Sequence, residues 1–572
     1  SFKDSNDDGI GDLRGITSKV DYLAELGITA IWMNPINNSP LADFGYDVSD
    51  YRSIDPMYGN FSDLKELIDA LHAKDLKILV DFVPNHSSDE HEWFTKSVNR
   101  EGNYTNYYVW KDAKVVENAK TVPNNWQAVF TNSAWEWNEK RQQYYLHQFL
   151  AEQPDLNYRD PNLVNEMQEI VKFWYNLGVD GLRVDAVKYL AEDEQFRDEP
   201  LKDPTLPVSM FNVDHKYREN QPLTYQIIKD WNQIVKNLAS ADGKDRVMLQ
   251  EVYDNVTIMN SYSGGVEYPF SICLNGDIIY ALTKGMTARD FTRHVQSWLD
   301  AVPQGSPPNF LVSNHDNNRV VSKLGKEMAD TINMILAVLP GIMVSYYGEE
   351  LGMEDAYVTW EQTKDPSGLR LGKEHYLERS RDPARSPMQW DDTVNSGFCS
   401  ANCTPWLPLS TDFWSVNVAA QKAAKKSHLK VYQSLMRLRK SSTFQSEKTQ
   451  YQINATDDSI MGVLRWADDD KKYLLIANFN TNWTKPLNST FINIFKLNNI
   501  TTFTVYCSSI NSGYDDGQKI TVSENMILRP QSAVILQNFQ SAASSIIVSS
   551  FLLCISLSIA VMFRLSEDHL FC

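Results

Sequence analysis

The chain has 572 residues, long enough for several packing units or for one large barrel that carries smaller appendages. Hydrophobic residues make up 42% and charged residues 22%, an ordinary globular composition that excludes global disorder and a small disulfide scaffold. The 73 acidic side chains outnumber the 54 basic ones and give a formal charge of −19. Because such a surface repels polyanions, we expect no nucleic-acid partner.

The first residues read SFKDSNDDGIGDLRG, without an initiator Met or an apolar leader. We therefore expect a truncated N-terminus, with any signal peptide lost ahead of Ser1. Downstream, short runs rich in Val and Ile alternate with amphipathic stretches, the pattern of parallel strands joined by helices. Strands are predicted at 29–34, 77–83, 181–186, 247–252, 309–313 and 342–347, with a less regular one near 271–274. Helices are expected between them, for example at 62–73 and 163–176.

This alternation predicts the α/β class and a (β/α)8 TIM barrel, provided that one strand preceded Ser1. Two segments break the pattern. A polar, aromatic and Asn-rich stretch reads as a domain inserted after one strand, and short alternating strands near the C-terminus suggest a small antiparallel β-sandwich. The predicted division is 1–86 and 161–451 for the barrel, 87–160 for inserted domain B, 452–540 for the sandwich and 541–572 for a membrane-anchor segment.

The anchor prediction depends on an uncharged, largely apolar run at 546–563, which is just long enough to span a bilayer. A lipid-anchor signal is the competing interpretation, because the small residues at 541–545 resemble an attachment site, although the usual polar spacer is short or missing. A buried core helix is the third. We expect tethering to the extracellular face of the plasma membrane, by a lipid anchor or by a C-terminal transmembrane helix.

Two further features are consistent with an exterior location. Cys399 and Cys403 lie four apart in FCSANC and could close a tight surface disulfide, whereas Cys273 and Cys507 are expected to be buried free thiols. Asn-X-Ser/Thr sequons for glycosylation occur at Asn37, Asn60, Asn103, Asn255, Asn402, Asn454, Asn482, Asn488 and Asn499.

Catalytic chemistry is expected at the carboxyl ends of the barrel strands, because the loops there build the site in this architecture. Any one acid there could equally serve a surface turn. Three acids, two His and an Arg together form an inward-facing polar ring whose desolvation is costly unless a reaction uses it. Paired carboxylates can flank a glycosidic bond and divide nucleophilic attack from proton donation. The polar residues that follow or end these strands are Asp81, Asn85, His86, Arg183, Asp185, Glu251, Asn314, His315 and Asp316.

The segments DFVPNH, GLRVDAVKY, QEVY and LVSNHDNNR closely resemble the four signature segments of the alpha-amylase family of glycoside hydrolases, in the same order. QPDLNYRDPNL at 153–163 resembles a fifth segment as found in the oligo-1,6-glucosidase and α-glucosidase branch. The resemblance extends from Ser1 to about residue 540, and within the family the chain looks most like insect membrane-bound maltases. It implies an exo-acting, retaining α-glucosidase acting on maltose, sucrose and short oligosaccharides by double displacement.

Carried over to this sequence, the resemblance implies that Asp185 is the nucleophile and that Glu251 is the general acid and then the base. Asp316 would fix the sugar at the reacting subsite. Arg183, two residues before Asp185 on the same strand face, could also hold that carboxylate ionised. Ala186 follows the nucleophile where related enzymes carry Val or Thr, so this position leaves the linkage preference open.

The resemblance also implies a substrate-binding set. His86 and His315 would bind sugar hydroxyls, and Tyr46 would stack on the terminal glucose. Asp47 would grip the outer hydroxyls with Arg381 as its partner, which would close the pocket and favour cleavage from the non-reducing end. A structural ion pair is the alternative for Asp47 and Arg381. The full set is Tyr46, Asp47, His86, Arg183, His315 and Arg381.

The segment DSNDDGIGD places oxygen-bearing side chains at alternating positions around glycines, an arrangement that can wrap a hard cation. It is not an EF-hand, because the twelfth position is Gly15. Related α-glucosidases bind calcium in this loop, which implies a structural Ca²⁺ and no organic cofactor; a plain acidic turn is the alternative. The implied ligands are Asp4, Asn6, Asp8, Ile10 and Asp12.

Two other classes of function remain open. One is a binding protein on the same fold, such as an amino-acid-transporter heavy chain or a surface receptor, although such relatives tend to lack the acids. Heavy chains also place their membrane segment before the barrel. The other is a transglycosylase or sucrose isomerase, which uses the same covalent intermediate but transfers the glucosyl group to a sugar.

Overall fold

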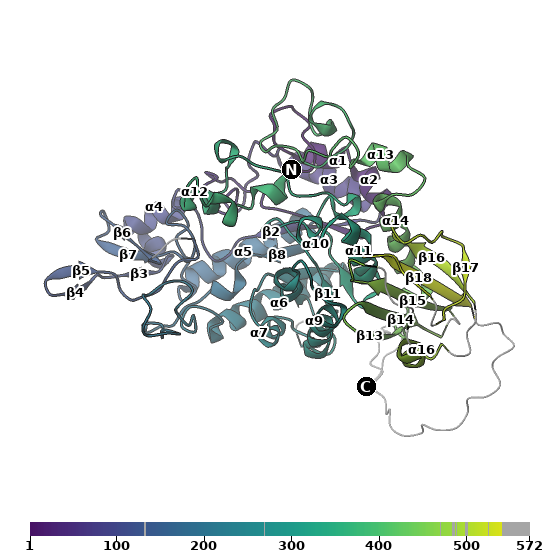
Figure 1. Ribbon diagram of the computed structural model, residues 1–572. Helices are drawn as coiled ribbons and strands as arrows, with labels where there is room; N and C mark the ends of the chain where they lie inside the picture. The colour runs from purple at the N-terminus through teal and green to yellow at the C-terminus, as the bar shows by residue number, and fades with distance from the viewer. Residues whose placement is uncertain are drawn as a thin grey trace, which may run out of the picture.

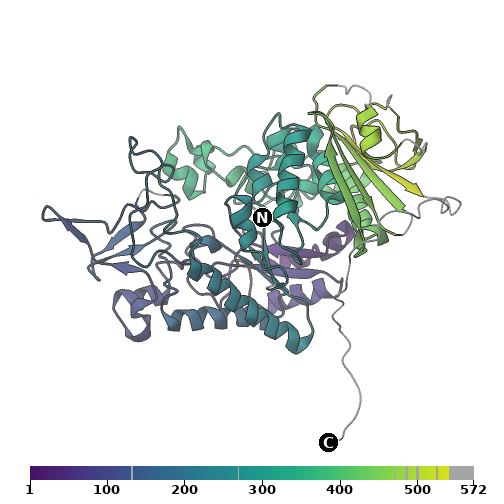
Figure 2. The same ribbon diagram turned by 90° about the horizontal axis from the view of Figure 1, so that it is seen from below.

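The computed structural model describes residues 1–539 except 131–132, 268, 469–470, 483–486, 488, 498–501 and 524–525. Figures 1 and 2 both place an inserted lobe and a C-terminal sheet at opposite ends of a central barrel region. Among the described residues, no helix has the length and apolar character needed to cross a membrane. The predicted anchor segment, 541–572, with its apolar run, lies outside the described residues.

The central region is built on short parallel strands in the order that the sequence predicts. Strands β1, β2, β8, β9 and β10 form one sheet, and β11 pairs with β12. The side chain of Asn309 joins the two sheets, because it donates to the carbonyl of Cys273 at 2.7 Å and accepts from the backbone of Asn275 at 2.8 Å. The strands are β1 (Ala30–Met33), β2 (Lys77–Phe82), β8 (Gly181–Val184), β9 (Val247–Gln250), β10 (Ser271–Cys273), β11 (Asn309–Phe310) and β12 (Ile342–Met343).

Helices alternate with these strands, as the sequence pattern predicts. The side chain of Asp160 caps α5 by accepting from two backbone N–H groups, Pro161 opens the helix, and Gly178 ends it in the left-handed conformation. The longer helices are α3 (Phe61–His72), α5 (Pro161–Leu177), α6 (Pro222–Asp242), α9 (Ala288–Ala301), α11 (Ala329–Val338) and α14 (His428–Arg439). The shorter ones are α1 (Leu13–Thr17), α2 (Val20–Leu26), α7 (Val256–Ser261), α8 (Asp277–Ala281), α10 (Val320–Leu324), α12 (Pro366–Leu371), α13 (Val418–Ala423) and α15 (Ser442–Gln445).

The strands pack tightly around the residues that carry the chemistry. All four residues of β8 are buried, and a Cβ added to Gly181 would lie 2.7 Å from the Leu79 side chain and 2.9 Å from the Val247 carbonyl. Glycine is therefore needed for β8 to sit between β2 and β9. This close approach fixes the positions of Arg183 and Asp185, at the carboxyl end of β8, relative to the two neighbouring strands.

Domain B forms the inserted lobe between β2 and α5. Its strands pair antiparallel as β3–β7–β6 and β4–β5 around a small core that contains Trp126, Trp135 and Leu146. The loop after β8 is fastened to it, because Trp126 donates to the Arg197 carbonyl at 2.9 Å. The elements are α4 (Glu92–Val98), β3 (Trp110–Lys111), β4 (Lys114–Val116), β5 (Ala119–Thr121), β6 (Trp135–Asn138) and β7 (Gln143–Leu146).

The C-terminal region is antiparallel, as predicted. Its described strands form one six-stranded sheet, β13–β14–β15–β18–β16–β17, rather than two facing sheets. Alternation gives this sheet two apolar faces: Leu475 and Ile535 join the barrel core, whereas Leu474 and Ile476 pack with Phe491 of the helix α16 (Ser489–Ile494). Helices thus take the place of a second sheet. The strands are β13 (Gln450–Ala455), β14 (Ile460–Trp466), β15 (Lys471–Asn478), β16 (Phe503–Ser508), β17 (Lys519–Ile520) and β18 (Ala533–Phe539).

Asp330 on α11 joins the barrel to this C-terminal region. One carboxylate oxygen bonds the Nδ1 of His428 at 2.7 Å, and the other accepts from the backbone N–H of Ile510 at 2.8 Å. Burial opposes a charge on His428, but the hydrogen bond to Asp330 outweighs it and raises the pKa of His428.

This contact predicts a pH-dependent stability. A raised folded-state pKa stabilises the protein fully below the unfolded histidine value of about 6.5, and the contribution is lost as pH rises through the folded pKa. The Tm difference between the parent and Asp330→Asn should therefore be largest in mild acid and narrow at alkaline pH. Thermal unfolding across this range is the measurement. In a His428→Gln background, the Tm difference caused by Asp330→Asn should not vary with pH. If the Tm difference is equally independent of pH when His428 is present, the assignment is contradicted.

Candidate active site

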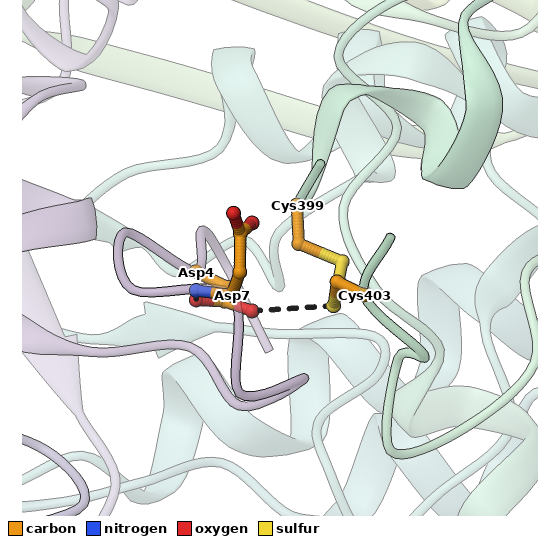
Figure 3. A group of neighbouring side chains, drawn as sticks. All are labelled: Asp4, Asp7, Cys399 and Cys403. Atoms are coloured by element: carbon orange, nitrogen blue, oxygen red, sulfur yellow. Dashed lines mark hydrogen bonds between the residues drawn. A yellow bond between two sulfur atoms is a disulfide. The ribbon is translucent and has the colours of Figure 1, made fainter. Parts of the chain in front are cut away.

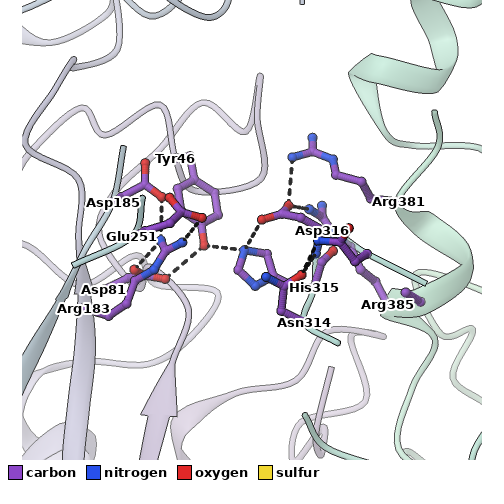
Figure 4. A network of polar contacts seen from close by, with 12 residues as sticks. Tyr46, Asp81, Arg183, Asp185, Glu251, Asn314, His315, Asp316, Arg381 and Arg385 are labelled. Carbon is purple, nitrogen blue, oxygen red and sulfur yellow. Dashed lines mark hydrogen bonds and ion pairs between the residues drawn. The ribbon is translucent and has the colours of Figure 1, made fainter. Parts of the chain in front are cut away.

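Charged side chains from several barrel strands meet in one network at the carboxyl ends of those strands (Figure 4). Arg183 lies within β8, and Asp185 follows that strand directly. Glu251 follows β9, and Asp316 lies in the loop after β11. The three acids predicted from the sequence as catalytic are thus brought to one place.

The guanidinium of Arg183 is shared by three carboxylates. Its Nη1 contacts Asp81 at 2.8 Å and Asp185 at 2.5 Å, and its Nη2 contacts Glu251 at 2.5 Å. Burial opposes the charge on Arg183, but the three acids keep its pKa well above the ordinary value. One fully buried cation therefore positions three acidic side chains at once.

Three acids around one cation leave an excess of negative charge in a buried place. Burial raises the pKa of Asp81 to about 6 even though Arg183 opposes the shift. Burial also raises the pKa of Asp185 well above its ordinary value, and the neighbouring Glu251 and Asp81 carboxylates add to the rise. Burial and mutual repulsion therefore favour the protonated forms of Asp81 and Asp185 more than in isolated carboxyl groups, and the two titrate as parts of a coupled group.

Exposure separates the acids that can reach a ligand from those that support them. The side chains of Asp185, Glu251 and Asp316 are 11%, 13% and 25% exposed, whereas those of Asp81 and Arg183 are 0% and 1% exposed. The first three side chains are in contact with solvent, whereas the last two are enclosed by the protein. Asp81 therefore acts on the site through Arg183.

Glu251 is held from a second direction by backbone. Its Oε2 accepts from the N–H of Ala186 at 3.1 Å, and Ala186 adopts a left-handed conformation with φ 48° and ψ 32°. This conformation is costly for a residue with a Cβ. The turn after Asp185 thus aims an N–H group at the neighbouring acid.

Asp316 has a different electrostatic environment from the Arg183 group. Its carboxylate contacts Arg385 at 2.9 Å, Arg381 at 3.2 Å and the His315 ring at 3.2 Å. Burial alone would raise its pKa, but the interaction with the adjacent His315 ring and the charges of Arg381 and Arg385 outweigh burial and hold the pKa of Asp316 well below the usual range. The surroundings of Asp316 therefore favour its ionised form, unlike those of Asp81 and Asp185.

The two predicted histidines are neutral hydrogen-bonding groups. Burial lowers the pKa of His315 to about 3, and it lowers the pKa of His86 to about 3 as well. The Tyr46 hydroxyl lies 2.9 Å from Asp81 and 2.8 Å from the His315 Nε2, and its ring stacks on the His315 ring. Tyr46 thereby connects the Arg183 group to the Asp316 group.

The predicted pairing of Asp47 with Arg381 is wrong. Arg381 contacts Asp43 at 2.8 Å instead, together with Asp365 at 2.7 Å. The carboxylate of Asp47 is fully buried and accepts from the Ser39 hydroxyl and from the backbone N–H groups of residues 42 and 43. Asp47 thus shapes the turn that presents Asp43, and has no oxygen directed at Arg381.

Sequence reasoning missed three residues around Asp316 and Arg381, namely Asp43, Asp365 and Arg385. Asp43 lies three residues before Tyr46 in ADFGYD, and Arg385 follows Arg381 in SRDPAR. Both stand beside residues that the sequence singled out, so the local signal was present. The spacing of two neighbouring acids in the sequence does not determine which of them contacts a distant Arg.

The predicted calcium loop folds into a turn held by its own side chains. Asp4 accepts from three backbone N–H groups, and Asp12 caps α1 while it accepts from Ser5. Asp8 accepts from the side chain of Asn6 at 3.1 Å and from the N–H of Ile10 at 2.9 Å. The donor set is all oxygen, and carboxylate oxygens keep a further lone pair, so its chemistry suits Ca²⁺.

A grouping of ligand atoms close enough to hold an ion does occur beside this loop among the described residues (Figure 3). It comprises Asp4, Asp7, Cys399 and Cys403, so Asp4 is the one predicted calcium ligand within it. The two sulfur atoms form a disulfide, which ties up both as ligands. Cys273 and Cys507 are buried free thiols, as expected from the sequence.

The model of the alpha-amylase catalytic domain matches residues 1–447. The chain belongs to the alpha-amylase family. Maltase A1 of Drosophila melanogaster is 40% identical over 537 residues, which cover 92% of each protein. The alpha-glucosidase of Apis mellifera is 41% identical over 482 residues, 84% of this chain and 83% of the relative. The amino acid transporter heavy chain SLC3A1 of Rattus norvegicus is 36% identical over 494 residues, 85% of this chain and 70% of the relative.

Solved structures of the same fold lead to the same conclusion for this alpha-amylase-family chain. A mutant of the trehalulose synthase MutB in complex with its substrate sucrose superposes with a TM-score of 0.81 at 28% identity, over 94% of this chain and 97% of that one. The alpha-glucosyl transfer enzyme XgtA gives 0.79 at 29% identity with the same coverage. The predicted class is confirmed: the chain is a glycoside hydrolase with a TIM-barrel fold and an antiparallel C-terminal region.

The revised partner of Arg381 can be tested by exchanging each acid for its amide. Asp43→Asn should lower kcat/KM on maltose by about tenfold or more, because a charge-assisted hydrogen bond contributes about 1.5–3 kcal/mol. Its Tm should change little. Asp47→Asn should instead lower the Tm, because its amide would set an N–H group against backbone donors. Steady-state kinetics and thermal unfolding of both variants are the measurements. The reverse pattern would restore Asp47 as the partner.

Proposed function

We propose that the chain is an exo-acting, retaining α-glucosidase that releases α-glucose from the non-reducing ends of maltose, sucrose and short oligosaccharides. The observation that carries the proposal is the pair of partly exposed acids, Asp185 and Glu251, on one buried guanidinium. A nucleophile and a proton donor on adjacent sides of one opening are what double displacement at an anomeric centre requires. Relatives named maltase and alpha-glucosidase support this substrate class.

In the proposed reaction, Asp185 attacks the anomeric carbon while Glu251 donates its proton to the leaving oxygen. The covalent glucosyl ester on Asp185 is then hydrolysed by a water that Glu251 deprotonates, which returns both residues to their starting states. Asp316, whose lowered pKa favours the ionised form, accepts hydrogen bonds from hydroxyls of the reacting glucose. His86 and His315, both neutral, can donate or accept toward the same ring. Two displacements at one carbon retain the α configuration.

The Asp316 side of the site supports exo action. Arg381 is held by Asp43 from the loop after β1, by Asp365 from the loop after β12 and by Asp316. Its guanidinium also lies over the ring of Phe130 from domain B, 5.4 Å from the ring centroid. Because these four contacts fix its side chain, Arg381 closes one side of the site. We propose that the space left accommodates one terminal glucose and excludes a longer chain.

Two alternatives share this fold. Glucosyl transfer would use the same intermediate, and the structural similarity to a trehalulose synthase and to a glucosyl transfer enzyme keeps it in view. Product analysis at high sugar concentration separates transfer from hydrolysis. The similarity to a transporter heavy chain points to a binding role. The complete set of Asp185, Glu251 and Asp316 favours catalysis.

Removing either reacting acid tests the proposal. Asp185→Asn should abolish glucose release from maltose and sucrose, and Glu251→Gln should lower kcat by about 10²–10⁴-fold because proton donation is lost. Asp300→Asn, an exposed acid on α9, is the matched control and should leave kcat unchanged. NMR of the parent reaction should show α-glucose appearing before mutarotation. Initial β-glucose, or full activity in Asp185→Asn, would contradict the mechanism.

We further propose that Ca²⁺ binds the loop at Asp4, Asn6, Asp8, Ile10 and Asp12 and stabilises the fold. Because the ion would bind the folded loop and not the unfolded chain, calcium should stabilise the native state. The Tm should therefore rise when the free calcium concentration increases from the low level set by a chelator to the millimolar range. Asp8→Asn should weaken this rise, whereas Asp300→Asn should preserve it. A Tm that is equal in chelator and in calcium would exclude a structural ion here.

The proposed location is extracellular, with tethering through the apolar run at 546–563. A relative named salivary alpha-glucosidase, from Aedes aegypti, supports the exterior location. The Cys399–Cys403 disulfide is consistent with an oxidising compartment. The tether itself is supported by the sequence of the run.

A further inference from the structure

Several sequons lie on elements whose geometry decides whether a sugar could be attached. N-linked glycosylation substitutes the side-chain nitrogen of asparagine and leaves the side-chain oxygen in place. The atom that each Asn already uses in the fold therefore determines whether the modification is compatible with the native state. Asn37 uses its nitrogen in the interior, whereas Asn255 caps a helix with its oxygen and has its nitrogen at the surface, and this contrast separates two kinds of sequon.

Asn37 uses its nitrogen inside the protein. The side chain is 4% exposed, and its Nδ2 lies within 3.1–3.3 Å of the carbonyl oxygens of Asp50, Tyr51 and Ser53. The third residue of this sequon, Ser39, donates its hydroxyl to Asp47 at 2.8 Å. Both polar residues of the sequon thus hold the turn that carries Asp43 and Tyr46. A glycan would replace one of the two hydrogens on Nδ2, would leave too few donors for these carbonyls, and would have no space.

Asn60 and Asn255 use their oxygens at helix ends. The Oδ1 of Asn60 accepts from the N–H groups of Ser62 and Asp63 in a capping box at α3. The Oδ1 of Asn255 accepts from the N–H of Ile258 at the start of α7, and its Nδ2 makes one exposed contact, to the adjacent Asp254 carboxylate at 3.2 Å. Both side chains are exposed. The cap survives when a sugar occupies the nitrogen, because only the oxygen accepts.

At Asn103, the fold uses neither the side-chain oxygen nor the side-chain nitrogen. It is exposed in a 3₁₀ turn of domain B at 102–106, and within the described residues its side chain makes no hydrogen bond. The sequons at Asn488 and Asn499 lie outside the described residues, and the one at Asn482 runs into them.

We propose that Asn60, Asn103 and Asn255 carry N-linked glycans in the active protein and that Asn37 does not. This inference depends on the extracellular location proposed above, because the sugar is added only along the secretory route. Asn37 and Ser39 then match the sequon pattern only because both side chains stabilise the turn. A molecule modified at Asn37 would lose the turn that presents Asp43 to Arg381.

Heavy-oxygen labelling of the full chain secreted from insect cells tests the assignment. Peptide N-glycosidase F in heavy-oxygen water converts each glycosylated Asn to labelled Asp, which mass spectrometry of peptides locates. Label is expected at Asn60, Asn103 and Asn255 and not at Asn37. Label at Asn37 in active enzyme, or none at the other three, would overturn the proposal. Maltase activity of the same sample keeps this outcome separate from failure of the proposed function.

A matched pair of variants provides a second readout. Asn103→Gln should remove one glycan and increase gel mobility by one step, whereas Asn37→Gln should leave the mobility of the secreted chain unchanged. An unchanged Asn103→Gln or a faster Asn37→Gln would contradict the assignment. If Asn37→Gln is not secreted because the turn fails to form, the labelling of the parent chain still decides the question.

Discussion

One buried guanidinium organises the chemistry of this protein. Arg183, 1% exposed on β8, contacts Asp81, Asp185 and Glu251 within 2.8 Å. An unpaired buried charge would be strongly destabilising, and three acids without this cation would repel one another. The cation and the acids therefore depend on each other, and the parallel strands β2, β8 and β9 hold them in register. Gly181 allows these strands to approach closely enough for the contact to form.

The site consists of two electrostatic halves joined by a neutral bridge. The Arg183 half carries excess negative charge, and burial raises the pKa of Asp81 and Asp185. The Asp316 half is surrounded by Arg381 and Arg385 and loses its proton readily. Tyr46 and His315 connect the halves without adding charge. Similar carboxylates are thereby prepared for different tasks by their surroundings, which lets one pocket bind sugar hydroxyls and break a glycosidic bond.

Asp185 and Glu251 could be predicted from the sequence because each directly follows an apolar run, and parallel strands end at one edge. Asp43 could not be distinguished from Asp47, because Arg381, 338 residues from Asp43, selects its partner through tertiary structure alone. In the C-terminal region, alternation indicated a sheet with two apolar faces. It could not reveal that α11 and α16 cover those faces, since one helix lies far away in the chain.

The central claim is that Asp185 forms the covalent bond to glucose. A fluorinated glucosyl fluoride measures this directly, because fluoride leaves readily while the ring fluorine slows release of the glucosyl-enzyme. Mass spectrometry of the inactivated protein should show one added fluoroglucosyl group on the peptide that contains Asp185, and Glu251 should remain unmodified. Attachment to another residue, or turnover with no adduct together with initial release of β-glucose, would contradict the account.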